Sequence, residues 1–225
     1  MIMMTDNVCV TDVMKEYKQL QAMIYAIEHY PEINRTKLMK YIFFIDLFTY
    51  NKTSNTLLED CYIRLPNGPV PKYGFEYTRQ EFMLSVSSKK LFDIKKITTE
   101  NGYYYQFKLK EGVHTDLSKF SEGEIDLLAL TLETVKSRKT AYLSDLSHTY
   151  DLWKNYHDGY NINLSDFRLS PDELEHLETI LNTKKYLNTL NQEKEDLEKE
   201  GLTFPRRLPM FFNAKTKEPI NQEKK

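Results

Sequence analysis

One segment, residues 35–50, is apolar on every side of a helix. Its apolar residues recur at helical spacing and also fill the remaining sides: Leu38, Tyr41, Ile42, Phe43, Phe44, Ile45, Leu47 and Phe48. A helix without a polar face must be covered by other parts of the chain, so this segment predicts the central helix of the core. Its length of about 16 residues, or about 24 Å, is short for a membrane span. The charges of Lys37, Lys40 and Asp46 also argue against lipid.

A polar run and a proline-rich run follow this helix. Residues 51–55 compete with the helical backbone for hydrogen bonds and predict its end. Residues 57–65 predict a strand, and Pro66–Pro71 holds three prolines and one glycine, which predicts a rigid surface loop. Such a loop beside a buried helix either presents a binding surface or only connects two elements. The residues leave both interpretations open.

The N-terminal half also predicts a second helix and a hairpin. Residues 12–30 are amphipathic and precede the central helix by a short link, which indicates an antiparallel helical pair. Thr78 and Glu81 have the spacing of a capping box before a short helix. Residues 91–98 and 103–110 flank Asn-Gly, a strong hairpin signal. Because a two-stranded hairpin is marginal alone, the strand at 57–65 is expected as its third strand.

The C-terminal half predicts helices. Ser121 and Glu124 form a second capping box, residues 140–149 predict another helix, and the only tryptophan, Trp153, follows it. Ser170 and the proline behind it open a last helix with a leucine stripe as far as Gly201. The predicted fold is α+β: a mostly helical single domain, residues 1–200, with a small antiparallel sheet of two to three strands and a long C-terminal helix. Residues 201–225 form an apolar, then polar extension, which either docks on the core or is gripped by a partner.

Composition excludes several classes. The 225 residues carry a formal net charge of −2, so no overall basic field indicates binding to nucleic acid or anionic lipid. Two distant cysteines, Cys9 and Cys61, predict no disulfide framework, and with the absence of a secretory leader pattern they indicate a cytoplasmic protein that does not span a membrane. Cys61 is interpreted as a buried strand residue.

The chain lacks the sequence patterns of common active sites. It holds no glycine-rich phosphate loop, Cys-x-x-Cys pair, His-Glu-x-x-His or nucleophile elbow. We therefore expect no catalytic residues, no metal and no cofactor. His148 lies three residues from both Asp145 and Asp151, a spacing that suits a metal ligand or an oriented imidazole. A structural histidine beside aromatic residues is the more common role.

Basic residues also gather between two predicted helices. Lys136, Arg138 and Lys139 lie at this joint, which suggests a helix-turn-helix with residues 142–149 as the reading helix. Asp145 and Glu133 flank the same site, and a surface that contacts phosphates normally avoids carboxylates. A DNA-binding regulator is the competing interpretation.

Two blocks of the sequence form a pattern. The first reads Lys-Leu-x-Lys-Tyr-x-Phe-Phe and later Gly-Pro-Val-Pro, and the second holds Leu143, Leu146, Ser147, His148 and Trp153. In these blocks the sequence resembles the Panacea domain family, which contains the Soc-type proteolytic-adaptor antitoxin and GepA-like proteins of phages and mobile elements. The resemblance extends over residues 25–167. The matching residues are Lys37, Leu38, Lys40, Tyr41, Phe43, Phe44, Gly68, Pro69, Val70 and Pro71, followed by Leu143, Leu146, Ser147, His148 and Trp153.

This resemblance implies a protein-binding antitoxin without enzymatic activity. Its partner would be a cognate toxin, neutralised directly or passed to a cellular protease. A phage-encoded counter-defence protein is a further alternative. The candidate binding surface joins the proline-rich loop to the second block, provided that the fold brings them together: Pro66, Asn67, Gly68, Pro69, Val70, Pro71 and Tyr73 with Ser147, His148 and Trp153.

Overall fold

The fold is α+β and mostly helical, as predicted. A computed structural model describes residues 13–79, 91–100, 102–183 and 199. Its helices are α1 Val13–His29, α2 Arg35–Thr53, α3 Lys72–Tyr77, α5 Glu122–Ser137, α6 Thr140–Thr149, α7 Asp151–Lys154, η1 Leu164–Phe167 and α8 Pro171–Ile180. None of the helices in the described residues has the length and apolar character needed to cross a membrane.

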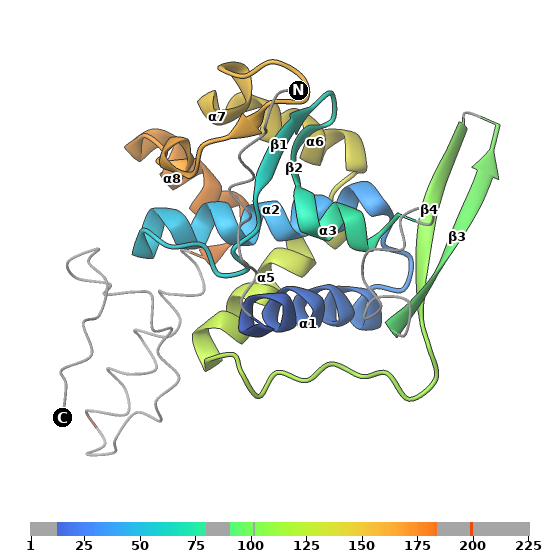
Figure 1. The fold of residues 1–225 in the computed structure, drawn as a ribbon. Helices are drawn as coiled ribbons and strands as arrows, with labels where there is room; N and C mark the ends of the chain where they lie inside the picture. Colours follow the sequence, from blue (N-terminus) through green and yellow to red (C-terminus); the bar gives the residue numbers. More distant parts are fainter. Residues whose placement is uncertain (1–12, 80–90, 101, 184–198, 200–225) are drawn as a thin grey trace, which may run out of the picture.

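Helix α2 is the centre of the core, as its sequence predicts. Every residue from Lys37 to Thr49 is buried. The helix runs between α1 and α5 on one side and the β1–β2 hairpin with α6 on the other (Figure 1). It continues to Thr53, past the predicted end at Asn51. The reason is that the Asn51 Nδ2 donates to the Leu47 carbonyl at 2.8 Å, so this polar side chain bonds within the helix instead of breaking it.

The three-stranded sheet corrects the prediction of a surface loop at Pro66–Pro71. Strand β1, Tyr62–Leu65, pairs with β2, Gly68–Pro71, on one side and with β5, Asn161–Ile162, on the other. All four residues of β2 are buried, and only Pro66 and Asn67 remain as an exposed turn. Residues 57–61, expected as part of β1, lie outside the strand, so Cys61 precedes it and is half-buried.

Two prolines fit within β2 because of their spacing. The Lys72 N–H donates to the Cys61 carbonyl at 2.7 Å, so these two residues face each other across the strands. Two residues further along each strand, Val70 lies opposite Ile63. In an antiparallel pair every second residue directs its backbone groups away from the partner strand. Pro69 and Pro71 occupy those positions, where a missing N–H costs no bond to β1, so β2 is an edge strand.

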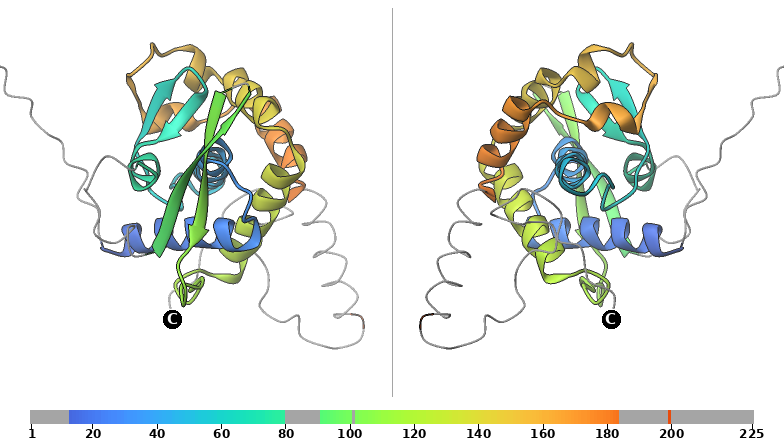
Figure 2. Two further views of the ribbon diagram at one scale, coloured as in Figure 1. Left: turned by 90° about the vertical axis from the view of Figure 1, so that its right-hand side faces the viewer. Right: turned by 90° about the vertical axis from the view of Figure 1, so that its left-hand side faces the viewer.

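The predicted hairpin is confirmed, but it forms a separate two-stranded sheet. Strands β3, Phe92–Thr99, and β4, Gly102–Leu109, pair in register from Phe92 with Leu109 to Thr99 with Gly102. The expected third strand pairs elsewhere, since β1 bonds to β2 and β5. The hairpin stands along one side of the helical body in Figure 1 and lies across the face turned to the viewer in the left part of Figure 2.

Both later helix starts are confirmed. Ser121 with Glu124, and Ser170 with Glu173, form complete capping boxes at α5 and α8. Helix α8 ends at Ile180, and Asn182 adopts a left-handed backbone with φ of 57°, so the long helix is interrupted there. Residues 184–198 of that predicted helix, residues 80–90 with the predicted short helix after Thr78, Cys9 and the extension from residue 201 lie outside the described residues.

Two buried carboxylates hold the β1–β2 hairpin in place. Asp46 of α2 accepts a hydrogen bond from the Tyr62 hydroxyl at 2.8 Å. Asp60 accepts from the Tyr73 and Gly74 N–H groups, both at 2.9 Å, and so caps α3 from outside the helix. Burial raises the pKa of Asp46 to about 7 and that of Asp60 to about 6. The hairpin is therefore tied to α2 at the start of β1 and to α3 after β2.

Candidate partner-binding site

The turn of the β1–β2 hairpin lies against α6, and Gly68 makes this approach close. Gly68 has a φ of 105°, a conformation that residues with a side chain rarely adopt. A Cβ atom there would overlap Lys40 Nζ of α2 and Ser147 Oγ of α6. The two blocks that the sequence analysis combined into one surface therefore do meet at this glycine.

Lys40 lies beneath the turn as a buried lysine with two hydrogen bonds. Its Nζ donates to Ser147 Oγ at 2.8 Å and to the Pro69 carbonyl at 3.4 Å. Only 1% of the residue is exposed, and this burial lowers the pKa of Lys40 to about 7. Ser147 in turn donates to the Ser144 carbonyl at 2.7 Å. Lys40 thus links α2, β2 and α6 at one point.

A stack of two aromatic rings lies against the other side of the turn. His148 of α6 and Trp153 of α7 stack with their ring centres 3.9 Å apart and their planes at 19°. The Trp153 Nε1 donates to the Leu65 carbonyl at 3.1 Å, which fixes the end of β1. The Arg64 guanidinium lies 4.1 Å from the Trp153 ring centre on this stack and forms an ion pair with Asp158.

The surroundings of the His148 imidazole lower its pKa. Desolvation lowers its pKa most, and the nearby positive charge of Lys40 lowers it further, while Asp145 raises it. Its Nε2 is buried and has no hydrogen-bond partner among the described residues. The ring contributes a flat surface stacked on Trp153.

The surface left by these contacts is narrower than predicted. Of the ten predicted residues, Gly68, Pro69, Val70, Pro71 and Ser147 are buried and support the turn from within. Tyr73 is half-buried in α3, at the opposite end of β2 from the turn. What remains accessible is a patch that we call the turn surface: Arg64, Pro66, Asn67, His148 and Trp153.

Sequence reasoning did not include Lys40 and Arg64 in the site. In the sequence Lys40 is a charge that argues against lipid and one residue of the family resemblance, yet a lysine in a helix that is apolar on every side is itself a signal of a buried, hydrogen-bonded amine. Arg64 has no comparable signal. Alternation along β1 predicts the face to which its side chain points, but it does not predict that an aromatic ring lies beside it.

The described residues give little support to the two competing interpretations, a metal site and a DNA-binding helix-turn-helix. Among the described residues no three His, Cys, Asp or Glu side chains come close enough together to hold a metal ion. The suggested reading helix, α6, buries Leu143, Leu146 and Ser147 against the core, and its exposed side carries Asp145. At the preceding joint, the Arg138 guanidinium lies over Tyr142 at 5.2 Å from the ring centre.

Comparison with known proteins adds one match. The family model for the SocA-like antitoxin, Panacea domain, matches residues 38–154, which is more than half of the chain. The chain belongs to this family. The match runs from α2 to α7, so it includes Lys40, the whole β1–β2 hairpin, Ser147, His148 and Trp153. No curated protein and no solved structure gave a match.

Membership supports a general antitoxin role and, with it, a toxin as the partner. The matched Panacea segment leaves out α1, β5 and α8. It is shorter at both ends than the resemblance seen in the sequence, which extended over residues 25–167. The turn surface lies wholly inside the matched segment, whereas part of the helical scaffold lies outside it.

Proposed function

We propose that this protein binds a partner toxin in the cytoplasm and neutralises it without catalysing a reaction, and that the turn surface makes the contact. The observation that carries the proposal is the overlap between the family match and the site. The matched residues 38–154 contain the lysine beneath the turn, the turn itself and the aromatic stack beside it. The family supplies the antitoxin role, and the proposal assigns that role to a surface.

Rigidity of the turn supports this assignment. Pro66 fixes one backbone angle, and the bond from Trp153 Nε1 to the Leu65 carbonyl fixes the strand before it. A surface that is already ordered loses little conformational freedom on binding, which favours affinity. Tryptophan and arginine are also the residues that most often dominate binding energy at protein interfaces. Trp153 and Arg64 lie against each other in the turn surface.

The test is a growth assay with the partner toxin that co-purifies with the tagged chain. Cells that express the toxin are given the wild-type chain, Asn67→Lys or Asn55→Lys. Asn67 is exposed in the turn, and Asn55 is an equally exposed asparagine in the loop after α2. We expect Asn55→Lys to protect like the wild type and Asn67→Lys to weaken toxin binding at least tenfold, about 1.4 kcal/mol, with loss of protection. Equal protection by both variants would remove the turn surface from the proposal.

Direct neutralisation and adaptor-driven proteolysis differ in the lifetime of the toxin. If the chain blocks the toxin by binding alone, the toxin persists in the complex with an unchanged half-life. If the chain passes it to a protease, the half-life falls when the chain is present and recovers in cells that lack the protease. A pulse-chase measurement separates the two routes. We propose direct binding as the step that both routes share.

A further inference from the structure

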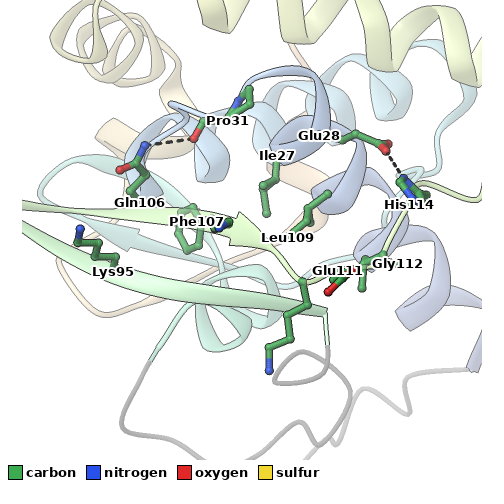
Figure 3. Close-up of a pocket in the computed structure, with 13 residues that line it drawn as sticks. Ile27, Glu28, Pro31, Lys95, Gln106, Phe107, Leu109, Glu111, Gly112 and His114 are labelled. Carbon is green, nitrogen blue, oxygen red and sulfur yellow. Dashed lines mark hydrogen bonds and ion pairs between the residues drawn. The ribbon is translucent and has the colours of Figure 1, made fainter.

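A groove beside the β3–β4 hairpin shares no residue with the turn surface. It encloses about 690 Å³ between the end of α1, strand β4 and the segment that follows β4 (Figure 3). Pockets that bind ligands measure about 300–1,000 Å³, so the volume suits a short segment of another molecule. Ile27 of α1 and Phe107 and Leu109 of β4 form its apolar floor.

The backbone of β4 is open along this groove. The Lys110 N–H donates to the Leu91 carbonyl at 3.0 Å, and Leu91 continues the register that pairs Phe92 with Leu109. By the alternation of antiparallel pairing, the N–H and C=O groups of Leu109 point away from β3, toward the outer edge. Within the described part of the chain no group bonds to them. An extended peptide can therefore add to this edge as a further strand.

The open edge has a defined end. Gln106 forms an isolated antiparallel bridge with Asn34, and its Nε2 donates to the Pro31 carbonyl at 3.4 Å. Figure 3 shows this bond at one end of the groove and the contact of Glu28 with His114 at the other. The chain itself thus pairs with the outer edge of β4 at Gln106 and leaves that edge unpaired at Leu109 among the described residues, so the accessible edge is short.

Lysine side chains line the groove on the hairpin side. Lys95 and Lys108 are exposed and form no ion pair with any described residue. Lys110, also in the lining, lies 3.7 Å from Asp93. Two amines are thus available to a ligand without breaking an existing pair.

The carboxylates of the groove offset this charge only in part. Glu28 contacts His114 Nδ1 at 3.0 Å and accepts from the Thr115 hydroxyl at 2.5 Å, and these bonds, Thr115 first, lower its pKa. The carboxylate of Glu28 is therefore already bonded to His114 and Thr115. Glu111 is the other carboxylate in the lining, against three lysines. Charge complementarity favours an acidic occupant.

We propose that this groove binds an extended, acidic segment of a partner protein. The backbone of the segment pairs with β4 at Leu109, alternate apolar side chains enter the floor formed by Ile27 and Phe107, and the carboxylates on the other side reach Lys95 and Lys108. This site goes beyond the antitoxin proposal, since it does not depend on the identity of a toxin or on the turn surface.

The test uses a fluorescein-labelled peptide of seven residues that alternates glutamate or aspartate with leucine or valine. Fluorescence anisotropy with the full chain is expected to give a Kd of about 10–100 µM at low salt, weakened by added salt. A peptide with lysine in place of each acid is expected not to bind. A peptide methylated on alternate backbone nitrogens is also expected not to bind, because it cannot pair with the strand edge. Binding of all three peptides with one affinity, or of none, would overturn the proposal.

Charge reversal locates the site. Lys108→Glu should weaken the acidic peptide at least tenfold, whereas Lys139→Glu, an exposed lysine outside the groove, should leave the affinity unchanged. Because Lys108 faces Asp93 across the hairpin, the reversal also places two acids opposite each other. Amide chemical shifts of the wild-type chain give the answer without a variant. We expect the Leu109 amide to move on addition of the peptide, and an unmoved Leu109 amide would overturn the proposal.

Discussion

Replacing Gly68 with alanine tests the architecture beneath the turn surface. The added Cβ overlaps Lys40 Nζ and Ser147 Oγ, and the residue must keep a φ of 105°. The backbone strain costs about 1–3 kcal/mol. Moving the buried amine off its hydroxyl partner costs about 1–3 kcal/mol more. We expect Gly68→Ala to lower the free energy of unfolding by about 2–6 kcal/mol, a large part of the 5–15 kcal/mol typical of a domain.

Gly112→Ala is the matched control for this prediction. Gly112 also has a positive φ, 76°, but a Cβ there meets no atom within 4 Å. It should cost only the conformational term, about 1–2 kcal/mol. Urea unfolding of both variants measures the difference, which is the contribution of the Lys40 and Ser147 contact. Equal destabilisation by the two alanines would refute the argument that Gly68 is required by close packing.

Three further outcomes follow from the buried polar groups. The pKa of Asp46 is raised from 3.8 to about 7, so its contribution to stability is complete below pH 3.8 and is lost as pH rises through about 7. The pKa of Lys40 is lowered from 10.5 to about 7, so its contribution to stability is complete above pH 10.5 and is lost as pH falls through about 7. The summed contribution of these two groups to the free energy of unfolding is therefore lowest near pH 7. In a urea series against pH, Asp46→Asn should reduce the dependence between about pH 4 and 7, and Lys40→Met should reduce it between about pH 7 and 10.5; an unchanged dependence in either variant would contradict this. Asp60→Ala should destabilise the fold by about 1–3 kcal/mol because two α3 N–H groups lose their acceptor, measured by thermal unfolding against Asp93→Ala, an exposed control. Trp153→Phe keeps an aromatic ring but removes the donor to the Leu65 carbonyl, and should increase amide hydrogen exchange in the β1–β2 turn while leaving β3–β4 unchanged.

The sequence predicts those elements whose signal is local. The central helix, the capping boxes at Ser121 and Ser170 and the Asn-Gly hairpin depend on neighbouring residues, and the structure confirms all of them. Strand β2 was missed because prolines normally argue against strands. Their spacing of two, Pro69 and Pro71, was the available signal, since it keeps both rings on the edge that donates no bond.

Long-range pairing is the part that local signals do not determine. The expected third strand of the hairpin pairs instead with β2 and with Asn161–Ile162, a two-residue strand almost a hundred positions later. Two residues are too few to show the alternation of apolar and polar side chains that predicts a strand. Likewise, the stack of His148 on Trp153 joins two helices across the extended residue Tyr150, so helical spacing does not predict it. The Arg64 guanidinium on this stack depends on how β1 meets α7. The family resemblance predicts that the two blocks share one surface, whereas composition carries no such information.

The most direct test of the central claim, that this antitoxin acts by binding a toxin at the turn surface, is affinity purification of the tagged chain at native expression level. We expect one protein to co-purify in stoichiometric amount, to be lethal when expressed alone and harmless beside the wild-type chain, and to be lost from the Asn67→Lys variant. Recovery of nucleic acid instead of a protein, or a toxin retained equally by Asn67→Lys, would contradict the account.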